Sequence, residues 1–354
     1  MTGTNFKKEL ILHYRQPAQM WTEAIPIGNG RLGGMVFGKV KHERIQLNED
    51  SLWSGGPQDA DNPEAFHNLE KARDLLLAGK FTEAQNLAFQ TMICQGGGSA
   101  DETYGSYQTL GDIQLDFTNH TSTPTDYYRD LNLDTAISSV RYRLGNDKFK
   151  REILSSWPDQ VLIVHLTCDN PGKISFDARL SRGIRNWETN SSATSHSSGQ
   201  NQEGFIEATA TSDHCLTLSG RTWKNSGMAF QANLQIIHEG GEIKITNQGL
   251  SVQQADNVTL LLAAATDYWE TDPQTSCTTH LEQASKKHYS ELRESHTNDY
   301  QQLFHRVSID LGSTEITNLP TDERLKFVKE GQDDPHLMSL YFQFGRYLLI
   351  SSSR

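Results

Sequence analysis

Most of the chain alternates between apolar and polar residues with the period of a β-strand. In Ile113–Phe117, for example, every second residue is apolar, which is typical of a strand with one buried face. Turns rich in glycine, asparagine and proline separate such runs. Further strands are predicted at Leu10–Tyr14, Gly34–Val40, Arg44–Leu47, Ala136–Tyr142, Phe149–Ser155, Val161–Thr167, Lys173–Leu180, Phe205–Ala210, Met228–His238, Glu242–Asn247 and Val258–Ala265. So many short strands up to residue 271 predict a mainly β fold, a large antiparallel β-sandwich.

Residues 63–93 interrupt this pattern with a helical one. Pro63 can begin a helix, and Phe66, Leu69 and Ala72 recur at helical spacing. Gly79 breaks the pattern, and a second helical segment starts at Phe81. No second copy of this unit occurs at a fixed period, so we expect one helical hairpin inserted into the β domain.

After residue 271 the period becomes helical again. His280–Phe304 places its apolar residues on one stripe, and Thr321 opens a short acidic helix. A last helix, residues 335–350, is apolar nearly all round, as expected for a helix packed on several sides. We therefore expect the chain to be a piece of a longer protein that ends as a helical domain begins. The apolar helix should then self-associate or be mobile.

Ile25–Trp53 is the stretch with the densest candidate chemistry. Gly28, Gly30 and Gly33 match the spacing of a dinucleotide-binding loop, but the residues that follow predict a strand rather than the helix which that loop requires. A glycine-rich turn that lets two strands approach closely is the favoured interpretation.

Polar and aromatic residues gather around that turn, as in a sugar-binding cleft. A flat ring stacks on the C–H face of a sugar, while amides and carboxylates bind its hydroxyls. For Glu49, Asp50 and Arg31 an ion pair between them is an equal alternative. For Trp53 packing in the core is favoured over stacking, and Tyr107 with Gln108 can simply close a turn. The candidates for substrate or domain-interface contacts are Asn29, Arg31, Asn48, Glu49, Asp50, Trp53, Tyr107 and Gln108.

Composition excludes several function classes. The 354 residues carry a formal net charge of −12 without a cluster of lysine and arginine, which argues against a nucleic-acid partner. The four cysteines lack CxxC spacing, so no metal site is predicted, and no sequence pattern calls for a cofactor. No apolar run suits a signal sequence or a membrane helix. The chain as written is therefore expected to be cytoplasmic and free of the membrane, although the parent protein could be exported.

An ordered set of motifs resembles the N-terminal half of glycoside hydrolase family 95, the α-L-fucosidases. Each motif is short, but together they span nearly the whole chain. They are Pro26–Gly38, Gln46–Pro57, Tyr107–Asp112, Asp130–Asp134, Leu260–Tyr268, His296–Tyr300, Leu303–Val307 and Phe344–Arg354.

This resemblance implies an N-terminal super-β-sandwich, a helical linker, an (α/α)6 catalytic barrel and a C-terminal β domain. On this chain it implies a sandwich over residues 1–271 with the helical insertion at 63–93, a linker over 272–334, and the first helix of the truncated barrel over 335–354. It also implies an inverting hydrolase that removes terminal α-L-fucose, often 1,2-linked to galactose.

The same resemblance places the catalytic residues outside this chain. In the family a glutamic acid donates the proton, and an asparagine pair helped by an aspartate positions the water, all downstream of the motif that ends at Arg354. The partners expected are thus a fucosylated oligosaccharide and the missing C-terminal catalytic barrel, and this chain alone is expected to be inactive. Two alternatives stay open: a free-standing carbohydrate-binding β-sandwich module, and an inert scaffold. The apolar helix at 335–350 favours the enzyme fragment over a binding module.

Overall fold

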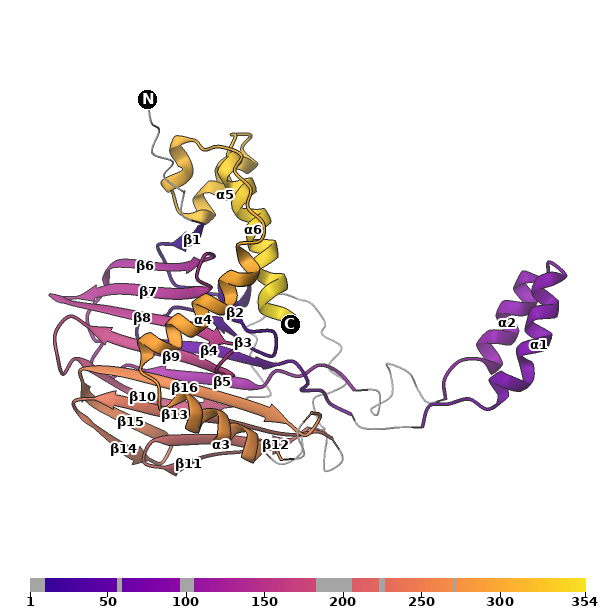
Figure 1. Ribbon diagram of the computed structural model, residues 1–354, viewed down its shortest axis with the longest axis horizontal. Helices are drawn as coiled ribbons and strands as arrows, with labels where there is room; N and C mark the ends of the chain where they lie inside the picture. Colours follow the sequence, from indigo (N-terminus) through magenta and orange to yellow (C-terminus); the bar gives the residue numbers. More distant parts are fainter. Residues whose placement is uncertain (1–9, 56–58, 96–104, 183–205, 223–226, 270–271) are drawn as a thin grey trace.

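The computed structural model of the chain is a β-sandwich with helices at one side and an inserted helical hairpin (Figure 1). It describes residues 10–55, 59–95, 105–182, 206–222, 227–269 and 272–354. Residues 1–9 and 183–205 lie outside these ranges, and with them residue 205 of the predicted strand 205–210.

Nine strands form the larger sheet, and every neighbouring pair is antiparallel. Their spatial order is β1-β6-β7-β8-β9-β16-β13-β12-β11. Their bounds are Ile11–Tyr14, Thr125–Asn132, Ile137–Leu144, Asp147–Ser156, Val161–Cys168, Asn257–Thr266, Ala229–Glu239, Cys215–Arg221 and Ile206–Ser212. Sequential strands mostly pair as hairpins, which is the arrangement that short polar turns favour.

Seven strands form the second sheet, which is also antiparallel. Their order is β14-β15-β10-β5-β4-β3-β2. Their bounds are Glu242–Thr246, Gly249–Ala255, Ile174–Ser181, Gly111–Asp116, His42–Glu49, Leu32–Val36 and Ile25–Gly28. The predicted mainly β sandwich is confirmed. Strands β6, β12 and β15 were not predicted individually, because polar residues and glycine dilute their apolar positions.

The core lies between the two sheets. Strand β5 shows how it is built, because its residues alternate between buried and half-buried positions, with Ile113 and Leu115 fully buried. Phe176, Leu250 and Leu262 belong to the same apolar cluster, which contains residues of both sheets. Burial of large aliphatic side chains on this scale is the main source of the sandwich's stability.

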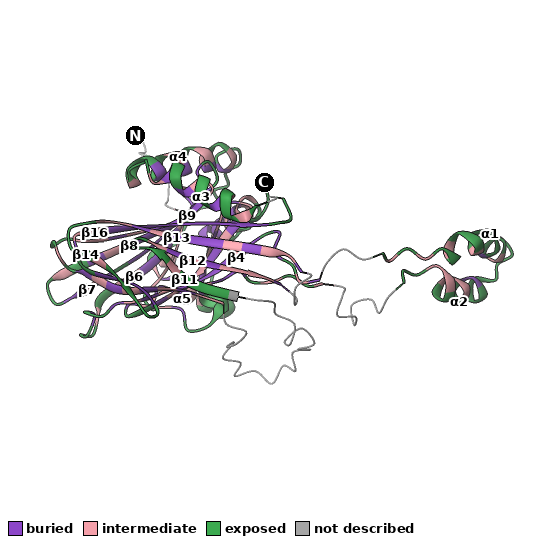
Figure 2. Cartoon of the chain, turned by 90° about the horizontal axis from the view of Figure 1, so that it is seen from below, coloured by how far each residue is buried: buried purple, intermediate pink, exposed green. Residues whose placement is uncertain are grey.

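The helical insertion predicted at 63–93 is confirmed as α1 (Glu64–Leu77) and α2 (Phe81–Thr91). Both views show the hairpin projecting away from the sandwich (Figures 1 and 2). Two side chains at the turn between its helices are largely exposed, with Leu77 at 87% and Phe81 at 67%.

The stripe predicted over 280–304 is divided between two helices, α3 (Pro273–Ala284) and α4 (Tyr289–Phe304). A capping box formed by His288 and Glu291 starts α4, so the chain turns where the sequence pattern suggested a continuous helix. Both helices lie over the outer face of the nine-stranded sheet (Figure 2). There Cys277, Leu281 and Leu292 are buried against apolar residues of the sheet.

The chain continues through a short 3-10 turn at Glu315–Asn318 into α5 (Thr321–Lys329) and α6 (Pro335–Ser352). Another 3-10 turn, Trp21–Glu23, lies near the N-terminus. A buried bidentate ion pair joins the two helices, with Arg324 Nε and Nη2 at 2.7 and 2.9 Å from the Asp334 carboxylate. Only one face of α6 is buried.

Among the described residues, no helix has the length and hydropathy needed to cross a lipid bilayer.

Candidate functional site

The glycine-rich stretch forms the β2–β3 hairpin, in which Ile27 pairs with Gly34 in antiparallel register. Strand β3 (Leu32–Val36) runs through Gly33, so the predicted strand in place of a helix is confirmed. Asn29 holds the turn, because its side-chain oxygen accepts the backbone N–H groups of Arg31 (3.0 Å) and Leu32 (2.7 Å). Its amide donates to the carbonyl of Ser156 at 2.9 Å, so this buried residue ties the hairpin to the opposite sheet.

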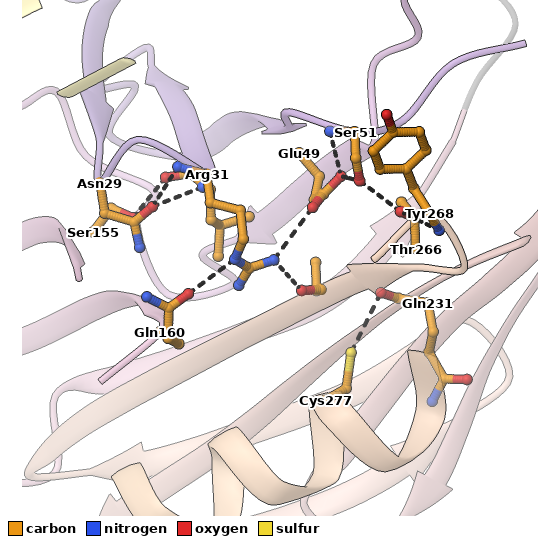
Figure 3. A network of polar contacts seen from close by, with 12 residues as sticks. Asn29, Arg31, Glu49, Ser51, Ser155, Gln160, Gln231, Thr266, Tyr268 and Cys277 are labelled. Atoms are coloured by element: carbon orange, nitrogen blue, oxygen red, sulfur yellow. Dashed lines mark hydrogen bonds and ion pairs between the residues drawn. The ribbon is translucent and has the colours of Figure 1, made fainter. Parts of the chain in front are cut away.

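Arg31 lies at the centre of a polar network between the sheets (Figure 3). Its Nη1 is 3.3 Å from Glu49 Oε1 and donates to the carbonyl of Ala264 at 2.6 Å. Its Nε donates to Gln160 Oε1 at 2.9 Å. One guanidinium therefore connects the hairpin, strand β4, the β8–β9 turn and strand β16.

Glu49 is the other half of this network and is almost inaccessible, with 1% exposure. Its Oε2 accepts the backbone N–H of Ser51 at 2.9 Å and its hydroxyl at 2.7 Å. Burial raises the pKa of Glu49, while the Ser51 hydroxyl and the charge of Arg31 act to lower it. Both carboxylate oxygens already have protein partners, so this buried side chain fastens the end of β4.

Trp53 and Tyr107 form a half-exposed aromatic pair at the same end of the sandwich. Their rings meet edge to face with centroids 5.5 Å apart, and the two residues also form an isolated antiparallel bridge. They are 47% and 45% exposed, so Trp53 does not belong to the core. The Tyr107 hydroxyl donates to Asn48 Oδ1 at 2.6 Å. Two ring surfaces beside a fixed amide are able to stack on a sugar and bind its hydroxyls.

The last two predicted residues flank this aromatic pair. Gln108 donates its backbone N–H to Leu52 at 2.9 Å, and its side-chain amide donates to the Ser106 hydroxyl at 3.1 Å. Asp50 is exposed, and its backbone N–H donates to the Arg31 carbonyl at 3.0 Å. The predicted set thus divides in two. Asn29, Arg31 and Glu49 form an internal network, whereas Asn48, Asp50, Trp53, Tyr107 and Gln108 form a partly exposed edge.

The sequence prediction missed partners that come from distant strands. Gln160 contacts Arg31 across 129 residues of chain, and the Thr266 hydroxyl lies 2.5 Å from that of Ser51 across 215 residues. Thr222 donates its hydroxyl to the carbonyl of Trp53 at 2.7 Å. Of these residues, Thr266 lies within the motif Leu260–Tyr268, which could have suggested it.

One group of metal-ligand types occurs elsewhere among the described residues: Asp147, Cys168 and Asp169. Its carboxylates already have protein partners. Asp147 accepts from Asn170 at 2.6 Å and pairs with Lys173 at 3.1 Å, and Asp169 accepts the backbone N–H of Lys148 at 2.8 Å. This group gives no support for a metal site.

Comparisons with known proteins place both parts of the chain among glycosyl hydrolases. Residues 12–271 match the family described as "Glycosyl hydrolase family 65, N-terminal domain", and residues 288–354 match "Glycosyl hydrolase family 95 catalytic domain". The resemblance found from the motifs is therefore confirmed.

Among curated relatives, the chain is 34% identical to Alpha-L-fucosidase 2 of Arabidopsis thaliana, over 100% of this chain and 43% of that protein. It is 28% identical to Probable alpha-fucosidase A of Aspergillus niger, over 94% of this chain and 41% of that protein. The chain thus spans less than half the length of these relatives. A solved structure, described as "Putative kojibiose phosphorylase from human microbiome", shares the fold with a TM-score of 0.51 at 10% identity, over 98% of this chain and 40% of that one.

Proposed function

Since this chain belongs to the glycosyl hydrolases, through its family 65 N-terminal domain and its family 95 catalytic-domain segment, we propose that it is the N-terminal portion of an inverting α-L-fucosidase. That enzyme removes terminal α-L-fucose from glycans. The observation that carries the proposal is the 34% identity to an α-L-fucosidase along the whole chain. Residues 1–271 then form the sandwich domain, 272–334 the linker, and 335–354 the first helix of the catalytic barrel.

The chemistry of inversion supports a catalytic centre outside the candidate site. Most inverting glycosidases place a carboxylic acid and a carboxylate about 6.5–9.5 Å apart with room for a water molecule between them, and every inverting enzyme needs a group that protonates the leaving oxygen. Glu49 is buried and bound by Arg31 and Ser51, so it is unable to protonate a leaving group or activate water. The role proposed for this chain is to present Asn48, Trp53 and Tyr107 to the sugar or to the barrel, and to be inactive by itself.

A chimera tests the proposal directly. This chain would replace the aligned segment of the Arabidopsis relative, and release of fucose from 2′-fucosyllactose would be measured. The chimera should hydrolyse the substrate, whereas the 354-residue chain alone should not. A folded but inactive chimera would contradict the proposal, as would turnover by the chain alone.

The exposed aromatic pair also favours a second candidate function, a free-standing carbohydrate-binding module. The isolated chain would be titrated with 2′-fucosyllactose by calorimetry, next to its Trp53→Ala variant. Specific affinity that is lost in the variant supports the module. A matched control is Phe81→Ala, which removes an aromatic ring that is 67% exposed on the projecting hairpin.

A further inference from the structure

The outer face of the nine-stranded sheet changes from apolar to polar across three neighbouring strands. In one cross-strand row Ala263 of β16 pairs with Asn233 of β13, which pairs with Thr217 of β12. The next row runs in the same way from Ala265 through Gln231 to Ser219. The apolar end of each row lies in the cluster that includes residues of α3, and the polar end lies beyond that helix.

Helix α3 turns this polar face into a groove. It buries Cys277, Leu281 and Ala284, while Gln274 and Thr278 line the side that faces the polar strands. The groove encloses a volume of about 480 Å³. A second hollow of about 390 Å³ shares Ser219, Gln231 and Gln274 with it, so the two are continuous along the helix.

The lining of this groove suits hydroxyl groups. It offers the hydroxyls of Thr209 and Thr278 and the side-chain amides of Gln235 and Gln274. Neither amide has a hydrogen-bond partner among the described residues, so each can both donate and accept, as vicinal sugar hydroxyls require. Two carboxylates, Glu207 and Glu282, make the groove unfavourable for phosphate, sulfate or uronate.

Two exposed aromatic residues follow Asp267, which contacts residues of the second hollow. Asp267 accepts the backbone N–H of Ala229 at 2.9 Å and pairs with Arg221 at 3.4 Å, and both partners line the second hollow. The next residues, Tyr268 and Trp269, are 60% and 70% exposed, and their rings meet at 4.6 Å. A ring surface that can stack on a sugar is thus carried within two residues of Asp267.

We propose that the groove between α3 and strands β11–β13 is a second, non-catalytic site that binds a neutral polysaccharide chain. The side-chain amides of Gln235 and Gln274 and the Thr209 hydroxyl bind the sugar hydroxyls, Thr278 Oγ1, which donates to the Gln274 carbonyl at 2.9 Å, accepts from them, and Trp269 stacks on a sugar ring. The site goes beyond the proposed hydrolase function, since it involves none of the residues of the Trp53–Tyr107 edge and requires no fucose.

Affinity electrophoresis of the full chain tests this proposal. Native gels would contain galactomannan, arabinoxylan or laminarin as neutral probes, and polygalacturonate as an anionic one. At least one neutral polysaccharide should retard the chain, and polygalacturonate should not. Absence of retardation by all three neutral probes would overturn the proposal, and so would equal retardation by polygalacturonate.

Substitutions of residues that line the groove test whether the polysaccharide binds there. Gln235→Ala combined with Gln274→Ala should weaken binding about tenfold, as expected for the loss of two hydrogen bonds. Thr278→Trp should abolish it by filling the groove. Gln253→Ala, an exposed glutamine on β15 of the other sheet, is the matched control and should bind normally. Equal binding by the groove variants and the control would refute the site.

Discussion

The backbone N–H of Gly30 donates to the carbonyl of Ser351 at 2.8 Å, which joins the β2–β3 hairpin to the last turn of α6. This carbonyl is one of the four at a helix C-terminus that lack an intrahelical partner. Gly30 has a φ of +97°, and a side chain at Gly28 would overlap the Ser351 carbonyl oxygen. The glycine pattern that imitates a nucleotide loop therefore serves to receive a helix end.

The first prediction concerns this contact. Gly28→Ala should displace the end of α6 and destabilise the chain by about 1–3 kcal/mol, the usual cost of overpacking. Urea unfolding would give the free energy, and amide hydrogen exchange would show faster exchange over residues 345–352. Gly345→Ala is the control, because its added methyl group meets nothing within 4 Å, and it should be neutral or stabilise α6 by up to about 1 kcal/mol. Unchanged exchange in the Gly28 variant would count against the contact.

The second prediction concerns the buried ion pair. Arg31→Leu leaves the Glu49 carboxylate without its cation and should lower the free energy of unfolding at pH 7.5 by about 3 kcal/mol. Arg15→Leu is the control, since its 4.0 Å pair with Glu323 is well exposed, and it should change stability by at most about 0.5 kcal/mol. Similar losses in both variants would show that the internal network contributes little.

The stability that Arg31→Leu loses relative to wild type should be smaller at acidic pH. Burial raises the pKa of Glu49 above its ordinary value, so protonation favours the folded state as the pH falls. Removing Arg31 raises that pKa further, because the opposing positive charge is lost. The stability difference between wild type and Arg31→Leu should therefore shrink between pH 7.5 and pH 5, as measured by urea unfolding. A difference that stays constant or grows would contradict the assigned interaction.

These residues also show how far sequence reasoning reaches. The strand period at Ile113–Phe117 and the helical period around Phe66 led to the correct elements, since local patterns reflect which face of an element is buried. The pairing of Arg31 with Glu49 could be proposed because both lie in one short stretch. Gln160 and Thr266 could not be placed beside them, because their contacts depend on how distant strands meet.

The third prediction uses a buried histidine. His296 lies 3.0 Å from the Thr135 carbonyl through Nε2, and burial lowers its pKa to about 4. The folded state binds the neutral imidazole, so this residue's contribution to the free energy of unfolding is complete above pH 6.5. As the pH falls towards 4 the contribution is lost, and the loss amounts to about 3 kcal/mol in all. His296→Gln should therefore lose less stability than wild type between pH 7 and pH 4.5. The control is Tyr300→Phe, on the same helix as His296. It removes the 2.8 Å hydrogen bond that the Tyr300 hydroxyl donates to the Leu133 carbonyl, and it should lower stability by the same amount at both pH values.

The last prediction concerns the outer face of α6. Leu337, Leu340 and Tyr347 are buried, and the Tyr347 hydroxyl donates to the Pro26 carbonyl at 2.7 Å. On the other face Tyr341 is 74% and Leu349 68% exposed. The helix is thus covered on one side only, and its open side is an apolar surface of the kind that drives association.

Substituting both exposed residues, Tyr341→Gln and Leu349→Gln, should reduce self-association in sedimentation velocity and leave the midpoint of urea unfolding unchanged. The matched variant Phe66→Gln with Leu77→Gln removes two exposed apolar side chains from the projecting hairpin, where they are 80% and 87% exposed. It should leave association unaltered, because the association is expected to occur through α6. If only the hairpin variant dissociates the chains, the surface on α6 has been assigned the wrong role.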